Sequence, residues 1–525
     1  MVILMSTAGN RRWWALGAMA LAMLSVGLDG TILSVALPTL AVRLHASTVE
    51  LQWFVAAYTL VIAVAVLPGG LLGDRFGRKK MLMTGLAVFG IGSVWCAYSS
   101  TAGQFIAARV VAGVGAAICI PLSLSTLTVL FSERERPRAV GIWSSATFLA
   151  LPVGPILGGW LLSRYWSGWV FLINVPVVVL GLVALALAVP ESLSARRPAL
   201  DPVGVLASCA GLGLLTFGVI EAGQRGWSDG VALSEIAGGL LLLAGFGLWE
   251  LRLGRRTGGQ PLIDTALFRG RGFTWGTILA AMSGFAMIGV LFTVPQFFQA
   301  ILGTDAMGSG LRLLPMIGGT IIGAGGADRI AARIGVRSTA AAGFTLLAAG
   351  LFLGAATSTT SGFGFVAAWI AVIGAGLGLT FATTTSAALS ELSAERSGVG
   401  SAVMQSVQKV GAPLGSAVLG SVVNSAYRDH LHLAGLPGDL AGTVRDSVFA
   451  AQGVAGRLGS AGLLAQVRAA FTHGVDVMLV VCAVAMAVAV VLALLLLPGR
   501  GRHESTAPAA GPAEGPAERR PERVG

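Results

Sequence analysis

Two apolar segments, Leu51–Leu72 and Met81–Tyr98, are joined by the sequence Gly70-Leu-Leu-Gly-Asp74-Arg-Phe-Gly77-Arg-Lys-Lys80. Each segment is close to the about 20 apolar residues that a helix needs to cross a bilayer. The connection allows only a tight turn, which Gly77 permits because glycine adopts backbone conformations closed to other residues. Asp74 is placed to cap the second helix, and the four cations of the connection hold it in the cytoplasm. This stretch predicts two antiparallel transmembrane helices; a turn that only sets orientation is the alternative reading.

The composition of the whole chain points the same way. Its 525 residues are 55% hydrophobic and only 11% charged, with a mean hydropathy of +0.81. A soluble domain is roughly 25% charged, so a multidomain soluble enzyme is excluded. The four cysteines all lie in apolar runs and are expected to be inert packing residues. The chain is therefore expected to be an all-α integral membrane protein.

Applying the length rule along the chain predicts fourteen spans, eight in a first set and six in a second. The first set is Trp13–Leu37, Leu51–Leu72, Met81–Tyr98, Gln104–Phe131, Ala139–Leu162, Gly168–Pro190, Pro202–Glu221 and Val231–Leu251. The second set is Phe273–Ile301, Gly308–Ala327, Ser338–Thr357, Gly362–Leu389, Val399–Asn424 and Gly474–Leu497. Between the last two spans, residues 425–472 form a long outer loop with helical periodicity around Val444–Leu458 and Leu463–Phe471, which predicts a small folded hairpin.

The basic residues set the orientation. With both termini in the cytoplasm, 25 of the 35 Lys and Arg residues lie on the inner side and 8 on the outer side, which is the positive-inside bias. The net charge of +11 thus reflects topology, and nucleic-acid binding is excluded. Residues 498–525 are rich in Pro, Ala, Gly, Glu and Arg, which predicts a disordered cytoplasmic tail.

Three charged residues lie deep within predicted spans, namely Asp29, Arg109 and Lys409. Asp29 and Arg109 both fall in the outer half of the bilayer and are expected to share a layer. The pair is interpreted as a titratable carboxylate, which burial favours in its protonated form and a neighbouring cation favours in its charged form. An ion pair that only fixes packing is the alternative. Lys409 is either a second coupling group, a group that repels divalent cations, or a lysine satisfied by carbonyls and water.

Motifs in the turn after the second span, in the fourth span and in the fifth span resemble those of the major facilitator superfamily. The turn matches the signature loop of that family at Gly70, Asp74, Arg75, Gly77, Arg78 and Lys79. The segment from Arg109 to Gly115 is similar to its helix-four motif, whose arginine the resemblance links to proton coupling. Four residues of the fifth span resemble the motif that marks its antiporters, namely Gly154, Pro155, Gly158 and Gly159. Glycines at this spacing allow close helix contact, and the proline suits a kinked, repacking helix.

The match narrows to the fourteen-helix drug:proton antiporters, because the sequence from Leu28 to Pro38 resembles their first helix. That resemblance implies that Asp29 carries the proton, that Arg109 tunes it, and that Asp74 with its arginines latches the cytoplasmic side. Ser34 departs from the family, which usually has asparagine there. Spans nine to thirteen contain no Asp or Glu in their apolar interiors, which argues against export of divalent cations.

The resemblance also implies the domain organisation, which weak internal repeats support: a six-helix bundle over 1–190, two extra helices over 191–252, and a six-helix bundle over 253–497. Parallel repeats place a substrate site at their interface. Four residues of the ninth span are candidates for the cavity wall beside Asp29, although packing is the commoner role of such side chains: Phe285, Phe292, Gln296 and Phe297.

The sequence therefore predicts a proton-driven exporter of hydrophobic, monovalent cationic or neutral drugs, acting as a monomer in the cytoplasmic membrane without metal or cofactor. A narrow exporter of a self-made metabolite, an importer and a membrane-embedded enzyme are the alternatives. The enzyme has little support, because no nucleophilic or metal-ligand cluster lies within the spans. A nucleotide-driven pump is excluded, because the chain has no G-x-x-x-x-G-K-[ST] phosphate loop.

Overall fold

The computed structural model describes residues 2–131, 135–189, 191, 201–256, 262–263, 265–358, 361–390, 392, 397–433 and 436–498. Within these residues every regular element is a helix. The first half comprises α1 (Val2–Arg43), α2 (Thr48–Phe76), α3 (Arg78–Tyr98), α4 (Ala102–Leu130), α5 (Arg136–Arg164), α6 (Trp169–Leu172), α7 (Asn174–Ala188), α8 (Pro202–Arg225) and α9 (Gly230–Arg255). The second half comprises η1 (Thr265–Arg269), α10 (Arg271–Ala300), α11 (Ala306–Arg312), α12 (Leu314–Ile334), α13 (Val336–Gly354), α14 (Phe363–Ser390), α15 (Ser397–Asp429), α16 (Gly438–Asp446), α17 (Val448–Arg457) and α18 (Ala461–Leu496).

Each predicted span falls on a long helix, or on two helices in line for the sixth (α6 and α7) and tenth (α11 and α12). In the described part of the chain, eleven helical segments are long and apolar enough to cross a membrane. The other three predicted spans correspond to α5, α12 and α15. The all-helical, multi-pass architecture is thus confirmed, while the number of fourteen crossings stays a prediction.

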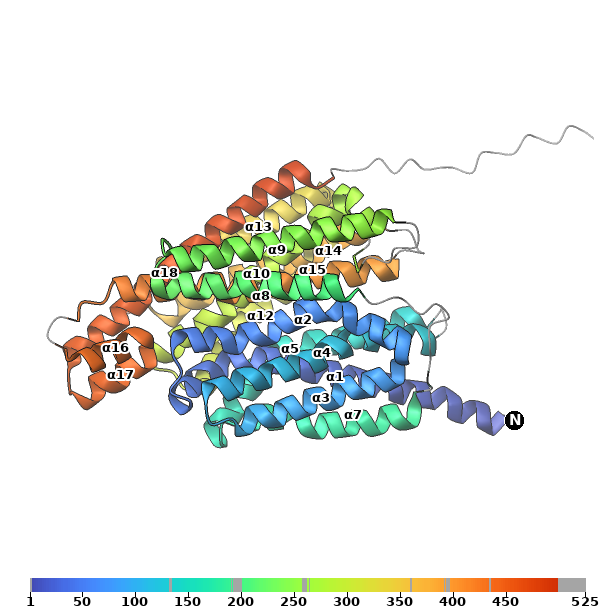
Figure 1. Ribbon diagram of the computed structural model, residues 1–525, viewed down its shortest axis with the longest axis horizontal. Helices are drawn as coiled ribbons and strands as arrows, with labels where there is room; N and C mark the ends of the chain where they lie inside the picture. The colour runs from blue at the N-terminus through green and yellow to red at the C-terminus, as the bar shows by residue number, and fades with distance from the viewer. Residues whose placement is uncertain are drawn as a thin grey trace, which may run out of the picture.

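The helices form two bundles, with α8 lying at the front between them and α9 beside it in front of the second bundle (Figure 1). The first bundle contains α1 to α7, and the second contains α10 to α15 and α18. The α8 helix bonds to the second bundle, because Ser421 donates to the Val219 carbonyl at 2.9 Å and Asn424 to the Gly223 carbonyl at 3.2 Å. It also meets α2 of the first bundle through the ring pair Trp53 and Phe217. The α8 helix therefore bridges the two bundles.

The helices α16 and α17 lie at one end of the molecule, which we call the outer end, whereas α1 begins and α18 ends toward the opposite, inner end (Figure 1). The two short helices occupy the predicted outer loop, so its helical character is confirmed. They are held by Tyr427, which donates to the Val444 carbonyl at 2.8 Å, and by Gln452, which donates to the Ala300 carbonyl at 2.6 Å. The neighbouring helices α15 and α18 extend further into this loop than expected. The predicted disordered tail lies outside the described residues.

The bundles are closed against each other at the outer end. Gln299 of α10 donates to the Val35 carbonyl of α1 at 3.0 Å, and the Gln52 amide of α2 lies 3.5 Å from the Ser421 hydroxyl of α15. These contacts join helices of the first bundle to helices of the second. They hold the two bundles together at the outer end.

Toward the inner end the same helices are more exposed. Exposed positions on α1 include Leu21 and Gly30, whereas residues 32–38 are all buried. On α10, half-buried positions such as Phe285 give way to complete burial over residues 289–298. Because α1 and α10 belong to different bundles and meet at their outer ends, this pattern indicates an accessible region between the bundles, open at the inner end. We call this region, bordered by Gly30 and Phe285, the inner space.

Candidate functional site

Asp29 and Arg109 form an ion pair inside the first bundle. The Nη1 atom of Arg109 lies 2.5 Å from Oδ2 of Asp29, and each side chain is only 1% exposed. Asp29 lies on α1 and Arg109 on α4, so the pair joins two helices. The arrangement brings together the two residues for which the sequence predicted a common layer.

Arg109 has two further partners on α2. Its Nε donates to the Phe54 carbonyl at 3.0 Å, and its guanidinium lies 4.1 Å from the centre of the Tyr58 ring. A guanidinium over an aromatic face is stabilised by the ring quadrupole. Arg109 is therefore fixed on three sides, which holds it in place beside Asp29.

The second oxygen of Asp29 faces a polar network that sequence reasoning missed. Asn174 of α7 donates from Nδ2 to Asp29 Oδ1 at 3.3 Å and lies equally close to the Ser93 hydroxyl of α3. Ser25, one helical turn before Asp29, donates to Asn174 Oδ1 at 2.8 Å. A buried asparagine in an otherwise apolar run was the available signal, but its spacing says nothing about which helix it meets. The carboxylate is thus held by one strong partner and one long hydrogen bond.

The pair faces into the first bundle and away from the inner space. The next two residues, Gly30 and Thr31, are exposed and half-buried respectively, so Asp29 lies directly behind the wall of that space. A small rotation of α1, or separation of Asp29 from Arg109, would therefore change its access to protons.

Lys409 lies elsewhere, on α15 of the second bundle. Its side chain is exposed although it lies in the middle of the long helix. Within the described residues it has no hydrogen bond or ion pair, and Asp29 is not its partner. The structure therefore does not bring the three charges of the spans into one cluster.

The turn after α2 has the predicted geometry, with one residue between α2 and α3. That residue is Gly77, whose φ of 107° is strained for residues with a side chain. The predicted cap is wrong, however. Asp74 pairs with the Arg78 guanidinium at 2.8 Å, and the start of α3 is capped by Glu191, which accepts from the backbone N–H groups of Lys79 and Lys80 at 3.0 and 3.1 Å. Asp74 lies on the last turn of α2, where its nearest donor is the Arg78 side chain.

Gly77→Ala is expected to destabilise the protein by about 1–3 kcal/mol, because a side chain would be strained at this φ and a Cβ would lie 2.7 Å from the Glu191 carboxylate. The midpoint of thermal unfolding in detergent measures the effect. Because Glu191 also caps α3, the double variant Gly77→Ala/Glu191→Ala is compared with Glu191→Ala alone. In that background the collision is absent and the strain stays, so Gly77→Ala should still destabilise, but less than in the wild type. No loss in that background would contradict the backbone explanation.

The glycines of α5 make close contacts on two sides. Gly154 and Gly158 face Thr31 and Ile32 of α1, within the first bundle. Gly159 faces α11 of the second bundle, where a Cβ would lie 2.6 Å from the Met307 Cα. The motif therefore lies at the outer closure between the bundles.

Three of the four predicted cavity residues do not face the inner space. Phe292, Gln296 and Phe297 are 3%, 4% and 2% exposed, and Gln296 donates to the Phe292 carbonyl at 2.6 Å. They lie in the part of α10 that packs at the closed outer end, whereas Phe285 is half-buried beside the inner space. Helical periodicity identifies the face of α10 that points inward. It does not show over what length of that face the two bundles pack against each other.

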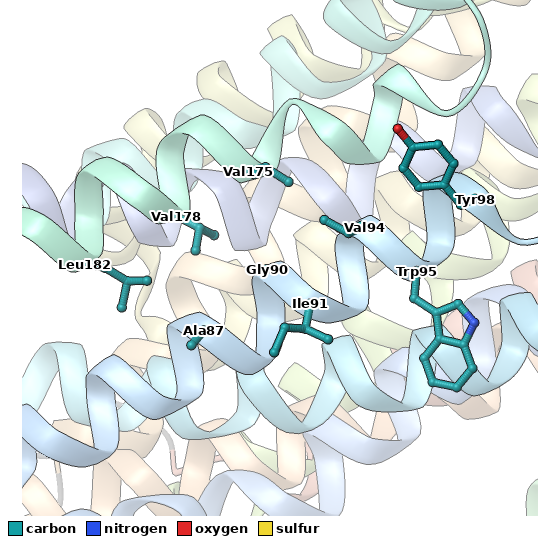
Figure 2. A pocket seen from close by; sticks show the side chains of 9 residues that line it. All are labelled: Ala87, Gly90, Ile91, Val94, Trp95, Tyr98, Val175, Val178 and Leu182. Atoms are coloured by element: carbon teal, nitrogen blue, oxygen red, sulfur yellow. The ribbon is translucent and has the colours of Figure 1, made fainter.

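An apolar groove of about 580 Å³ lies on the outside of the first bundle, between α3 and α7 (Figure 2). It is lined by Ala87, Gly90, Ile91, Val94, Trp95, Tyr98, Val175, Val178 and Leu182. Such a lining is typical of a surface that faces lipid, and it contains none of the charged residues described above. The groove is thus separate from the candidate site.

A further acid within a long helix was also missed. Asp476 of α18 is half-buried, and its Oδ1 has no hydrogen-bond partner within the described residues. It lies two residues inside the predicted last span, so the sequence placed it at the membrane edge. It is remote in sequence and element from the Asp29 network and provides a useful comparison.

The family model of the Major Facilitator Superfamily matches residues 19–416. The chain belongs to this superfamily. It is therefore a transporter and a multi-pass membrane protein, as the helical architecture also indicates. The signature turn, the Asp29–Arg109 pair and the α5 glycines all lie within the matched residues.

Relatives with curated descriptions include three resistance and export proteins. The chain is 34% identical to the tetracenomycin C resistance and export protein of Streptomyces glaucescens, over 80% of this chain and 77% of that protein. It is 30% identical to the multidrug efflux pump LfrA of Mycolicibacterium smegmatis, over 90% and 94%. It is 31% identical to the methyl viologen resistance protein SmvA of Salmonella typhimurium, over 81% and 86%.

Solved structures share the fold at lower identity. A bacterial homologue of the human lysosomal transporter Spinster, in an inward-facing and occupied conformation, has a TM-score of 0.67 at 17% identity, over 92% of this chain and 96% of that one. A D-xylose–proton symporter has a TM-score of 0.59 at 16% identity, over 93% and 98%. These likenesses concern the fold alone.

Proposed function

We propose that the chain is a proton-coupled exporter of hydrophobic drug-like compounds in the cytoplasmic membrane, with Asp29 as the proton carrier. The observation that carries this proposal is the buried Asp29–Arg109 pair, one residue behind the wall of the inner space. Buried ionisable groups within a membrane protein are expensive and commonly functional. The relatives named for resistance and export support the outward direction. In this proposal the chain has fourteen crossings, inner termini and the three-part division 1–190, 191–252 and 253–497, and acts as a monomer.

The coupling follows from the partners of Asp29. With the bundles closed at the outer end, Asp29 is paired with Arg109. The inner space is then open to a substrate from the cytoplasm. When the bundles open at the outer end, a proton on Asp29 weakens its attraction to Arg109 and α1 is free to repack. The proton is released inside when the pair forms again, so each cycle exchanges a substrate for a proton.

The turn after α2 and the α5 glycines have complementary roles in this proposal. The turn, with its Asp74–Arg78 pair, belongs to the inner gate, and the contact of Gly159 belongs to the outer gate. Alternating access requires the two gates to open in turn. If the Asp29–Arg109 pair served only packing, transport would continue after Asp29 is replaced. The effect of replacing Asp29 on transport therefore tests the proposal.

Asp29→Asn is expected to lower proton-driven transport at least about tenfold, because the amide cannot carry the proton whereas general acid–base groups of this kind contribute that much or more. Inverted membrane vesicles with an imposed proton gradient and a broad panel of fluorescent cationic, neutral and anionic dyes measure the rate. Asp476→Asn, which also removes a half-buried acid from a long helix, is the matched control and should transport at the wild-type rate.

Two results would count against the proposal. If Asp29→Asn transports as fast as the wild type under the gradient, the carboxylate is not the coupling group. If no dye of the panel responds to the gradient in wild-type vesicles, the exporter proposal fails. Movement of only one compound would favour the narrow exporter, for which the tetracenomycin C export protein is a relative by sequence.

A further inference from the structure

Lys409 lies on a face of α15 that its helix neighbours leave uncovered. Gly411 and Gly415 face α10, where a Cβ on each would collide with the backbone around Phe285. On another side Gly420 meets Gln52 of α2. Gly420 follows Lys409 by about three helical turns, which places both on nearly the same face of α15, and Lys409, nearer the inner end of that face, is exposed. Since an ammonium facing hydrocarbon in mid-span is costly, its exposure indicates water, and therefore the inner space.

The level of Lys409 along the membrane is set by the same contacts. The backbone N–H of Phe285 lies against Gly411, two residues after Lys409. Phe285 borders the inner space, so the ammonium and this half-buried ring lie at about the same depth. Gln405, one helical turn before Lys409, is also half-buried. An amide and a cation thus lie on one face of α15, at the depth of a half-buried aromatic ring of α10.

Within the described residues no acid forms an ion pair with Lys409. Asp29 is 1% exposed and already paired with Arg109, so that pair contributes no net charge to the wall. Glu235 and Glu250 lie on α9, outside the second bundle, and Asp476 lies on α18. A compound that reaches the level of Phe285 in the inner space therefore meets the unpaired positive charge of Lys409.

We propose that Lys409 binds the acidic group of the substrate, so that the transporter selects hydrophobic aromatic acids over cations of the same shape. An ammonium and a carboxylate form a short charge-assisted hydrogen bond, roughly twice as strong as a neutral one. The attraction is largest in a confined space with low-dielectric walls. This inference rests on the proposed function and replaces the expectation of monovalent cationic substrates. Neutral compounds are still expected to bind, because a nearby ammonium changes their binding free energy little.

The xanthene dyes fluorescein and rhodamine 123 provide the test, because they share a ring system and carry opposite charges. Both are measured in inverted vesicles under the same proton gradient. Wild-type vesicles are expected to transport fluorescein faster. Lys409→Gln should lower the ratio of fluorescein to rhodamine 123 transport at least about tenfold, Lys409→Arg should keep it, and Lys409→Glu should reverse the preference. Arg255→Gln, which removes an exposed cation at the inner end of α9, is the matched control and should leave the ratio unchanged.

The outcomes separate the inference from the proposed function. A wild-type preference for rhodamine 123, or a ratio that Lys409→Gln does not change, overturns the inference while gradient-driven transport itself stands. Equal losses for both dyes in Lys409→Gln also overturn it, because they identify a structural or coupling role. If neither dye moves, the inference fails; if no compound of the wider panel moves either, the proposed function fails with it.

Discussion

Arg109→Leu is expected to destabilise the protein by about 3–5 kcal/mol, the cost of breaking a buried ion pair by removing one partner. The change leaves the Asp29 carboxylate 1% exposed, with the long hydrogen bond from Asn174 as its remaining partner. It also removes the bond to the Phe54 carbonyl and the contact with the Tyr58 ring. Thermal unfolding in detergent and the yield of monodisperse protein measure the effect.

The double variant Asp29→Asn/Arg109→Leu separates stability from coupling. Without a charge on either helix, no uncompensated ion is buried, so most of the lost stability should return. Proton-driven transport should stay absent, because the proton carrier is missing. If the double variant transports like the wild type, the pair serves packing alone. If it is as unstable as Arg109→Leu, the destabilisation comes from lost contacts of Arg109 and not from the unpaired carboxylate.

A surface ion pair supplies the control for this cycle. Arg225 pairs with Glu221 at 2.6 Å on the last turn of α8, and the arginine is half exposed. Exposed pairs of this kind contribute little to stability because water and salt screen them, so Arg225→Leu should shift the unfolding midpoint little. A comparable loss in both variants would mean that burial of the Asp29 pair is not the cause.

The sequence predicted the helices well because the bilayer imposes a strong length and composition rule. The apolar run from Leu51 to Leu72 is visible without any knowledge of its neighbours, and the same holds for the other spans. The turn at Gly77 is equally local, since one residue separates two helices. Features that depend on about 20 consecutive residues or fewer could therefore be predicted from the sequence.

Features that depend on distant residues were not accessible. Glu191 caps α3 from a position more than 100 residues away along the chain, so nothing near Asp74 could show that the cap was already supplied. Asn174 reaches Asp29 from a separate helix, and periodicity does not give the rotation of α7 against α1. Phe292 is buried because the transporter is closed at its outer end. The sequence does not show which of its conformations the structure adopts, so it could not predict this burial.

Gly159→Val is expected to open the outer end of the transporter and to lower transport more than tenfold. A Cβ at this position would lie 2.6 Å from the Met307 Cα and 2.7 Å from the Ala306 carbonyl oxygen. Both are backbone atoms and do not give way as a flexible side chain does. Overpacking of this kind costs about 1–3 kcal/mol, and it penalises only the state in which α5 touches α11. A difference of that size changes the ratio of outer-closed to outer-open molecules about 5- to 150-fold.

The reporter for this opening is Gln299→Cys, because Gln299 bonds to the Val35 carbonyl at the same closure. A membrane-impermeant maleimide should label this cysteine faster in the Gly159→Val background than in the wild-type background, with the four native cysteines measured as the baseline. Gly245→Val is the matched control, since it makes the same change in a helix where a Cβ meets nothing within 4 Å. Unchanged labelling together with lost transport would place the effect of Gly159 within the first bundle. Unchanged transport would show that the contact of α5 with α11 is not part of the outer gate, because a transporter cannot complete its cycle when one of its two gates fails to close.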